Sequence, residues 1–157
     1  MSALYVIVRL RGRVDVPPDV EATLKLLRLT RKYTAVIYPK TDSIDGMLDV
    51  VKDWVTWGEI QAETLKKLIL ERGRTVGNKP LNEERIKELF GMDVDELVNA
   101  LIEGRIFWHK LEDKVKPVFR LHPPKGGFKR SIKKPLGSGG ELGYRGEAIN
   151  ELINRMV

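Results

Sequence analysis

Apolar residues follow two different periods along the first part of the chain. Three short runs rich in β-branched and aromatic residues predict strands, and apolar residues recur at helical spacing between them. The predicted strands cover residues 3–10, 34–38 and 54–57. Gly58 is predicted to break the third strand. One helix is predicted to run from a cap at Asp19 to about residue 31, and a second helix is predicted to begin at a cap of Asp42 or Ser43. This β-α-β-α-β order predicts three strands with helices packed on one face.

The second part of the chain is predicted to be mainly helical. Asn82 and Asp93 each stand directly before a helical pattern with acidic residues in its first turn, which is typical of helix N-caps. The predicted helices cover residues 60–72, 83–90, 93–103 and 147–156, and one short strand covers residues 118–121. We therefore predict a core at 1–58, a helical extension at 59–113, a closing strand with a basic loop at 114–146, and a helix docking on the core at 147–157.

The distribution of charge adds a functional signal to this pattern. The net charge is +6, yet residues 41–113 hold 10 basic and 16 acidic groups. Residues 1–40 hold 8 basic and 3 acidic groups, and residues 114–140 hold 8 basic groups and no acidic one. Charges of one sign without neutralising partners predict a polyanionic ligand, which is either nucleic acid or an anionic membrane.

The segment at residues 119–146 is too rich in Gly, Pro and Lys to build a core of its own. Ordering a backbone costs about 1–2 kcal/mol per residue, and the few apolar groups of this segment cannot offset that cost. We therefore expect it to stay mobile unless a large partner orders it. A basic segment that folds only on a polyanion is typical of proteins embedded in RNA.

Other chemistry is poorly supported by the sequence. His109 and His122 lie far apart without a pattern of acidic ligands, and the chain has no cysteine, so we predict no metal site, cofactor or catalytic group. The glycines at 137–140 lack the Lys-Ser/Thr pair of a phosphate-binding loop and predict a flexible turn. Trp54 and Trp57 could stack on bases but are more typical of a core. No transmembrane helix or signal peptide is predicted. The absence of cysteine suits a cytoplasmic protein.

Arg9, Arg11 and Arg13 alternate with other residues at the end of the first predicted strand. Residues at i, i+2 and i+4 of a strand point to the same face, so the three guanidinium groups are predicted to form one row. Such a row could protect the edge of the sheet from aggregation, or it could contact phosphates. The second basic block at residues 114–140 favours phosphate contacts.

Two long motifs resemble a known family. The first is TLKLLRLTRKYTAVIYPKTDSIDGMLDVVKDWVTWGE at residues 23–59, and the second combines FRLHPPKGGF at 119–128 with GGELGYRGEAINELINRMV at 139–157. Both are similar to the universal large-subunit ribosomal protein thirty family in its archaeal form, which is related to eukaryotic large-subunit protein seven. The resemblance covers essentially the whole chain.

This resemblance implies an α+β fold, with a ferredoxin-like core around an antiparallel three-stranded sheet and an archaeal helical extension. It implies a structural constituent of the large (50S) ribosomal subunit that binds rRNA and supports assembly and translation, with no catalytic role. It also implies a position near the 5S rRNA and contacts with neighbouring ribosomal proteins. A free-standing nucleic-acid-binding regulator is the alternative. The candidate rRNA-binding residues are Arg9, Arg11, Arg13, Arg28, Arg31, Arg120, Lys125, Gly126, Gly127, Lys129, Arg130, Lys133 and Lys134.

Overall fold

The computed structural model describes residues 4–157, so the predicted start of the first strand at Ala3 lies outside the described residues. The strands are β1 (Leu4–Arg9), β2 (Thr34–Pro39), β3 (Val55–Glu59), β4 (Phe119–Arg120), β5 (Ser131–Pro135) and β6 (Gly140–Tyr144). The α-helices are α1 (Pro18–Leu26), α2 (Asp42–Val51), α3 (Ala62–Arg72), α4 (Glu83–Phe90), α5 (Val94–Ile102) and α6 (Ile149–Met156). Two short 3₁₀ helices, η1 (Trp108–Lys110) and η2 (Gly146–Ala148), complete the α+β fold.

The sheet has six strands in the order β4-β2-β1-β3-β6-β5. β1 pairs antiparallel with β2 and β3, and β4 adds antiparallel to β2, whereas β6 runs parallel to β3. The predicted three-stranded antiparallel sheet is therefore wrong, because the sheet is larger and mixed. The extra strands β5 and β6 come from the Gly- and Lys-rich segment. They were missed because β6 is held by pairing with β3 and by burial of Leu142, contacts that are remote in sequence.

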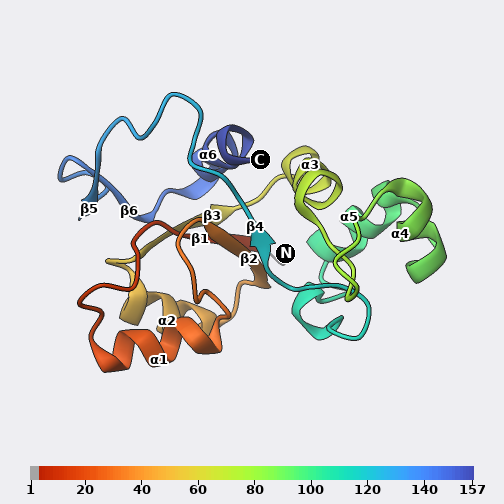
Figure 1. The fold of residues 1–157 in the computed structure, drawn as a ribbon, viewed down its shortest axis with the longest axis horizontal. Helices are drawn as coiled ribbons and strands as arrows, with labels where there is room; N and C mark the ends of the chain where they lie inside the picture. Colours follow the sequence, from red (N-terminus) through yellow and green to blue (C-terminus); the bar gives the residue numbers. More distant parts are fainter. Residues whose placement is uncertain (1–3) are drawn as a thin grey trace.

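The sheet is covered by helices on both faces (Figure 1). Val6 and Val8 of β1 belong to one core cluster, which contains buried side chains of α3, α5 and α6. Tyr5 and Ile7 belong to a second cluster, which contains buried side chains of α1 and α2. Burial on both faces explains why β1 is an almost uninterrupted apolar run in the sequence. The two helices that were predicted to share one face of the sheet, α1 and α2, do so. The later helices α3, α5 and α6 cover the other face.

Helix α1 ends at Leu26, earlier than the predicted residue 31. The backbone of Arg28 lies in the left-handed region, with φ of 66°. The Leu29 amide then donates to the Leu24 carbonyl at 2.8 Å, and the Arg28 amide donates to the Lys25 carbonyl at 3.0 Å. These two bonds close the helix in the manner of a Schellman motif and turn the chain towards β2.

Side-chain caps were predicted correctly for two of the helices. Asn82 accepts a hydrogen bond from the amide of the third residue of α4 at 2.9 Å, and Asp93 does the same for α5 at 2.8 Å. The cap of α2 is Thr41, not Asp42 or Ser43. Asp19 lies in the first turn of α1, which has no side-chain cap because it begins after a proline.

Gly58 continues β3 and does not break it, contrary to the prediction. A Cβ atom at Gly58 would overlap the carbonyl oxygen of Gly146 and would lie 2.9 Å from Cγ2 of Ile149. Replacing Gly58 with alanine must therefore push η2 and α6 away from the sheet. We expect Gly58→Ala to lower the free energy of unfolding by about 1–3 kcal/mol, measured by urea denaturation.

The matched control for this prediction is Gly46→Ala in α2. A Cβ atom at Gly46 meets no other atom within 4 Å, and alanine favours the helix. We expect this control to raise stability by about 0.5–1 kcal/mol. Equal stability of the Gly58→Ala variant and the unmodified chain would contradict the close packing of β3 on η2.

Candidate nucleic-acid interface

The fold brings the two basic blocks of the sequence together. Arg11, Lys32 and Lys133 line one cavity of about 310 Å³, together with Ile132 and the loop that follows β1. Asp15 is the one acidic residue among the described residues that line it. We call this space the basic cavity. Two segments about 100 residues apart in the sequence thus present their positive charge to the same volume of solvent.

The basic segment after β4 follows a defined path along the protein surface. The Lys125 amide donates to the Arg155 carbonyl at 2.9 Å, which ties the start of the segment to α6. The ring of Phe128 stacks on Tyr33 with centroids 6.2 Å apart. β5 and β6 then pair with a shift of register and are joined by a turn at residues 136–139, one residue earlier than the predicted turn at 137–140. The segment thus makes contacts with α6, Tyr33 and β3 that the sequence did not predict.

The cationic side chains of this segment remain accessible. All of them are exposed, and none forms an ion pair within residues 4–157. These residues are Lys125, Lys129, Arg130, Lys133 and Lys134. Gly126 and Gly127 are exposed and have φ of 80° and 74°, a backbone region in which side chains are strained. The segment therefore offers cations without ion-pair partners in the described chain, on a backbone that glycine adopts at this turn without strain.

Arg9 is a structural residue, because its side chain is only 3% exposed. Its Nη1 donates to the Leu29 carbonyl at 2.7 Å, its Nε to the Arg11 carbonyl at 2.8 Å, and its Nη2 to the Gly12 carbonyl at 3.1 Å. Burial lowers the pKa of this guanidinium from its ordinary value. The predicted row of Arg9, Arg11 and Arg13 on one strand is wrong, because β1 ends at Arg9. Arg9 instead shapes the loop that carries the other two arginines.

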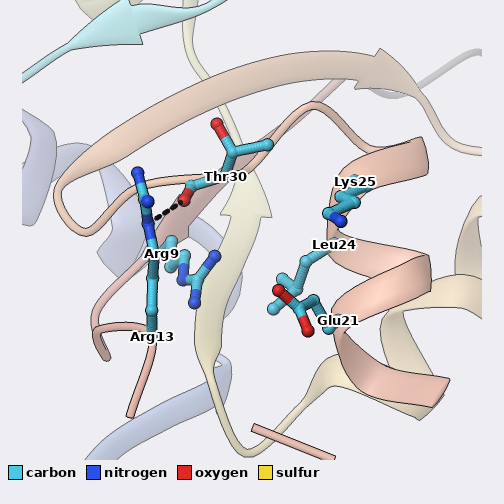
Figure 2. Close-up of a pocket in the computed structure, with 6 residues that line it drawn as sticks. All are labelled: Arg9, Arg13, Glu21, Leu24, Lys25 and Thr30. Carbon is cyan, nitrogen blue, oxygen red and sulfur yellow. Dashed lines mark hydrogen bonds between the residues drawn. The ribbon is translucent and has the colours of Figure 1, made fainter. Parts of the chain in front are cut away.

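Arg13 lies in a separate cavity of about 230 Å³ between this loop and α1. Figure 2 shows its guanidinium next to Arg9, with the hydrogen bond from Arg13 Nε to the Thr30 carbonyl at 3.1 Å. The carboxylate of Glu21 faces the same space from α1 (Figure 2). Arg11 lies elsewhere, over the ring of Trp54 at 4.6 Å from its centroid. The buried Trp54 thus holds the guanidinium of Arg11 by a cation–π contact.

Replacing Arg9 with alanine tests its structural role. The substitution leaves the buried Leu29 carbonyl without its donor and releases the loop after β1, so we expect the free energy of unfolding to fall by about 2–3 kcal/mol in urea denaturation. The exposed Arg13→Ala variant is the control and should change it by less than about 1 kcal/mol. A variant without Arg9 that is as stable as the unmodified chain would overturn this assignment.

The remaining predicted arginines lie near the β4 edge of the sheet. Arg28 forms an ion pair with Glu112 and donates to the His109 carbonyl at 3.1 Å. Arg31 and Arg120 line a cavity of about 370 Å³ that also contains Arg28. The structure therefore separates these three residues from the basic cavity.

Five cationic residues that line these cavities, or an adjoining one of about 250 Å³, had not been singled out from the sequence. They are Lys25, Lys32, Arg72, Arg74 and Lys116. Lys32 adjoins Arg31, and Lys116 belongs to the basic block at residues 114–140. The clustering of basic residues in the sequence could therefore have identified both as candidates. Arg72 and Arg74 lie in a segment whose net charge is negative, and counting charge by segment concealed them.

Residues 4–157 contain no group of three His, Cys, Asp or Glu side chains that could hold a metal ion. His109 packs against the ring of Tyr38 at 4.9 Å, and burial lowers the pKa of its imidazole. None of the helices described is both long and apolar enough to span a membrane.

Comparison with known proteins places the chain in a family. Residues 5–55 match the family model described as ribosomal protein L30p/L7e. The chain is 60% identical to large ribosomal subunit protein uL30 of Hyperthermus butylicus, an alignment that covers 98% of this chain and 90% of the relative. It is 57% and 45% identical to the proteins of the same name from Staphylothermus marinus and Saccharolobus solfataricus, over the full length of both chains in each case. The similarity thus extends through the helical extension and the basic segment, and the resemblance to the archaeal form is confirmed. The chain belongs to the ribosomal protein L30p/L7e family.

Proposed function

We propose that this chain is a structural constituent of the large ribosomal subunit, where it binds and stabilises rRNA and supports subunit assembly and translation in the cytoplasm. The observation that carries the proposal is the convergence of two basic segments on one cavity, next to exposed cations with no ion-pair partner in the described chain. The name shared by the relatives, large ribosomal subunit protein uL30, supports the same role.

The proposed rRNA contacts follow from the exposure of each candidate. The cations at 125–134, with Arg11 and Arg13, contact phosphates, and these contacts fix the position of the chain on RNA without reading its sequence. Gly126 and Gly127 let the backbone approach sugar and phosphate closely. Arg9 acts indirectly, since it holds the loop that carries Arg11. Arg28, Arg31 and Arg120 contribute from the β4 edge.

The division of the chain follows the same proposal. Residues 1–58 form a ferredoxin-like core, and residues 59–113 form a helical extension whose acidic surface suits contacts with neighbouring ribosomal proteins. Residues 114–146 supply the closing strand and the RNA-binding segment, and residues 147–157 dock on the core. The role needs neither a cofactor nor a catalytic group. We place the chain near the 5S rRNA within the large subunit, as the family resemblance implies.

Sedimentation of cell extracts tests this function. A tagged full-length chain should migrate with large ribosomal subunits on sucrose gradients at moderate salt and should stay with them after repeated centrifugation. A chain that remains at the top of the gradient and binds one DNA or RNA sequence in isolation would instead support a free-standing regulator.

A further inference from the structure

A second basic groove runs along the β4 edge of the sheet. It consists of two adjoining cavities, of about 370 and 250 Å³, that share Lys116, Val118 and Arg120. Six cationic side chains line the two cavities, and no acidic residue of the described chain does. These cations are Arg28, Arg31, Arg72, Arg74, Lys116 and Arg120. We call this space the β4 groove.

β4 lies between β2 and the helices of the extension (Figure 1), so the β4 groove lies where the core meets the helical extension. Arg120 belongs to β4 and is paired with Thr34 of β2. Arg72 ends α3, and the Lys116 amide donates to the Arg74 carbonyl at 2.9 Å. Segments that are far apart in the sequence therefore hold these cations in fixed positions. The groove exists only in the folded chain.

The charges in the β4 groove are poorly neutralised. The guanidinium groups of Arg31 and Arg120 make no hydrogen bond or ion pair in the part of the chain that the structure describes. Arg72 donates to the main-chain oxygen of Val157 at 3.2 Å, and Arg74 donates to the carbonyls of Gly73 at 2.8 Å and Glu71 at 3.5 Å. Arg28 is paired with the side-chain carboxylate of Glu112. A concave surface with this charge attracts a polyanion.

The composition of the groove favours phosphate over other anions. Five of its six cations are arginines, whose planar guanidinium groups can bind phosphate oxygens in pairs. The groove also extends across two cavities, which suits a chain of successive phosphates better than one small anion. RNA backbone has this repeating chemistry.

We propose that the β4 groove binds the phosphate backbone of an RNA segment different from the one at the basic cavity, so that one chain joins two RNA segments. This inference rests on the proposed rRNA-binding function. The two surfaces are distinct because β4 and β5 are opposite edge strands of the sheet, and each surface includes residues from one of them. Arg31 and Lys32, adjacent in the chain, line different cavities and mark the place where the two surfaces approach each other.

Footprinting of full-length variants on purified large-subunit rRNA tests the inference. The groove variant is Arg74→Gln with Arg120→Gln, and the cavity variant is Lys32→Gln with Lys133→Gln, two exposed cations that line the basic cavity. The exposed pair Lys67→Gln with Lys87→Gln removes the same charge elsewhere. We expect the groove variant to lose about 10- to 100-fold in affinity for the rRNA at 0.1 M salt. The slope of the logarithm of the binding constant against the logarithm of the salt concentration should become shallower by about 2. It should lose protection of one set of nucleotides, while the cavity variant loses another set.

Two results would overturn the inference while leaving the proposed function intact. One is a groove variant that binds and protects rRNA like the Lys67/Lys87 control. The other is loss of the same nucleotides in the groove and cavity variants, which would indicate a single binding surface. Failure of the unmodified chain to protect any rRNA would contradict the proposed function itself. Thermal unfolding is measured for each variant. Arg120→Gln alone, which removes no hydrogen bond or ion pair within residues 4–157, replaces the pair if Arg74→Gln lowers stability.

Discussion

Replacing the four cations of the β5 segment, Lys129, Arg130, Lys133 and Lys134, with glutamine will lower the affinity of the full chain for large-subunit rRNA by about 10²- to 10⁴-fold at 0.1 M salt. Each phosphate contact releases counterions, so four lost contacts should reduce the log–log salt slope by about 3–4. Binding is measured over a salt series from about 0.1 to 0.5 M, because affinity at a single salt concentration does not separate contact number from other effects.

The control for this variant removes the same charge from another part of the surface. Lys52, Lys67, Lys79 and Lys87 are all exposed, and their replacement by glutamine leaves the net charge equal to that of the test variant. We expect the control to lose less than about 10-fold, since only long-range attraction is weakened. Equal losses in the two variants would mean that net charge, and not the β5 segment, determines binding.

Replacing Phe119 with alanine will lower the free energy of unfolding by about 3–5 kcal/mol. Phe119 is fully buried in β4 and stacks on the buried Trp108, with centroids 5.5 Å apart and ring planes 18° apart. Trp108 follows α5, so this contact fastens the edge of the sheet to the helical extension. Urea denaturation measures the loss, and the melting temperature should fall by roughly 2–4 °C for each kcal/mol.

Leu26→Ala is the control for the Phe119 variant. Leu26 is 73% exposed at the end of α1, so its truncation should change stability by less than about 0.5 kcal/mol. A Phe119→Ala variant that loses less than about 1 kcal/mol would contradict the role of this aromatic contact. It would also remove the physical reason for a fixed β4 groove, because the groove is lined by residues of both the core and the helical extension, which this aromatic contact joins.

Features specified by neighbouring residues could be predicted from the sequence. The caps at Asn82 and Asp93 depend on bonds that span three residues, and both were located correctly. The apolar run of β1 predicts a buried strand whatever covers its faces. The C-terminal helix could be predicted because its apolar residues, at Ile149 and three later positions, recur at helical spacing and so share one face. All four are buried in the structure.

Features that depend on remote contacts could not be predicted. β6 forms because Leu142 enters the core and Gly143 pairs with Thr56, and nothing near them in the sequence signals a strand. Arg9 was predicted to face RNA because it alternates with Arg11 and Arg13 at the end of a strand. Its guanidinium instead donates to the carbonyls of Leu29 and of the loop after β1. The charge of a residue does not indicate its exposure when the fold supplies acceptors.

The candidate site was predicted in part for the same reason. Clustered charge identified the basic segment at residues 114–140, because its cations are neighbours in the sequence. Arg72 and Arg74 reach the β4 groove only after α3 packs beside the sheet, so no count along the chain could assign them. Surfaces assembled from several elements require the fold before their charge can be counted.

Cross-linking inside intact large subunits tests the central claim most directly. A photoreactive residue replaces Lys133 in the basic cavity, and a second chain carries it at Glu88 on the acidic helix α4 as the control. We expect position 133 to form cross-links to large-subunit rRNA and position 88 to form few or none. Large subunits that contain the chain but give no rRNA cross-link from position 133 would contradict RNA binding at the basic cavity.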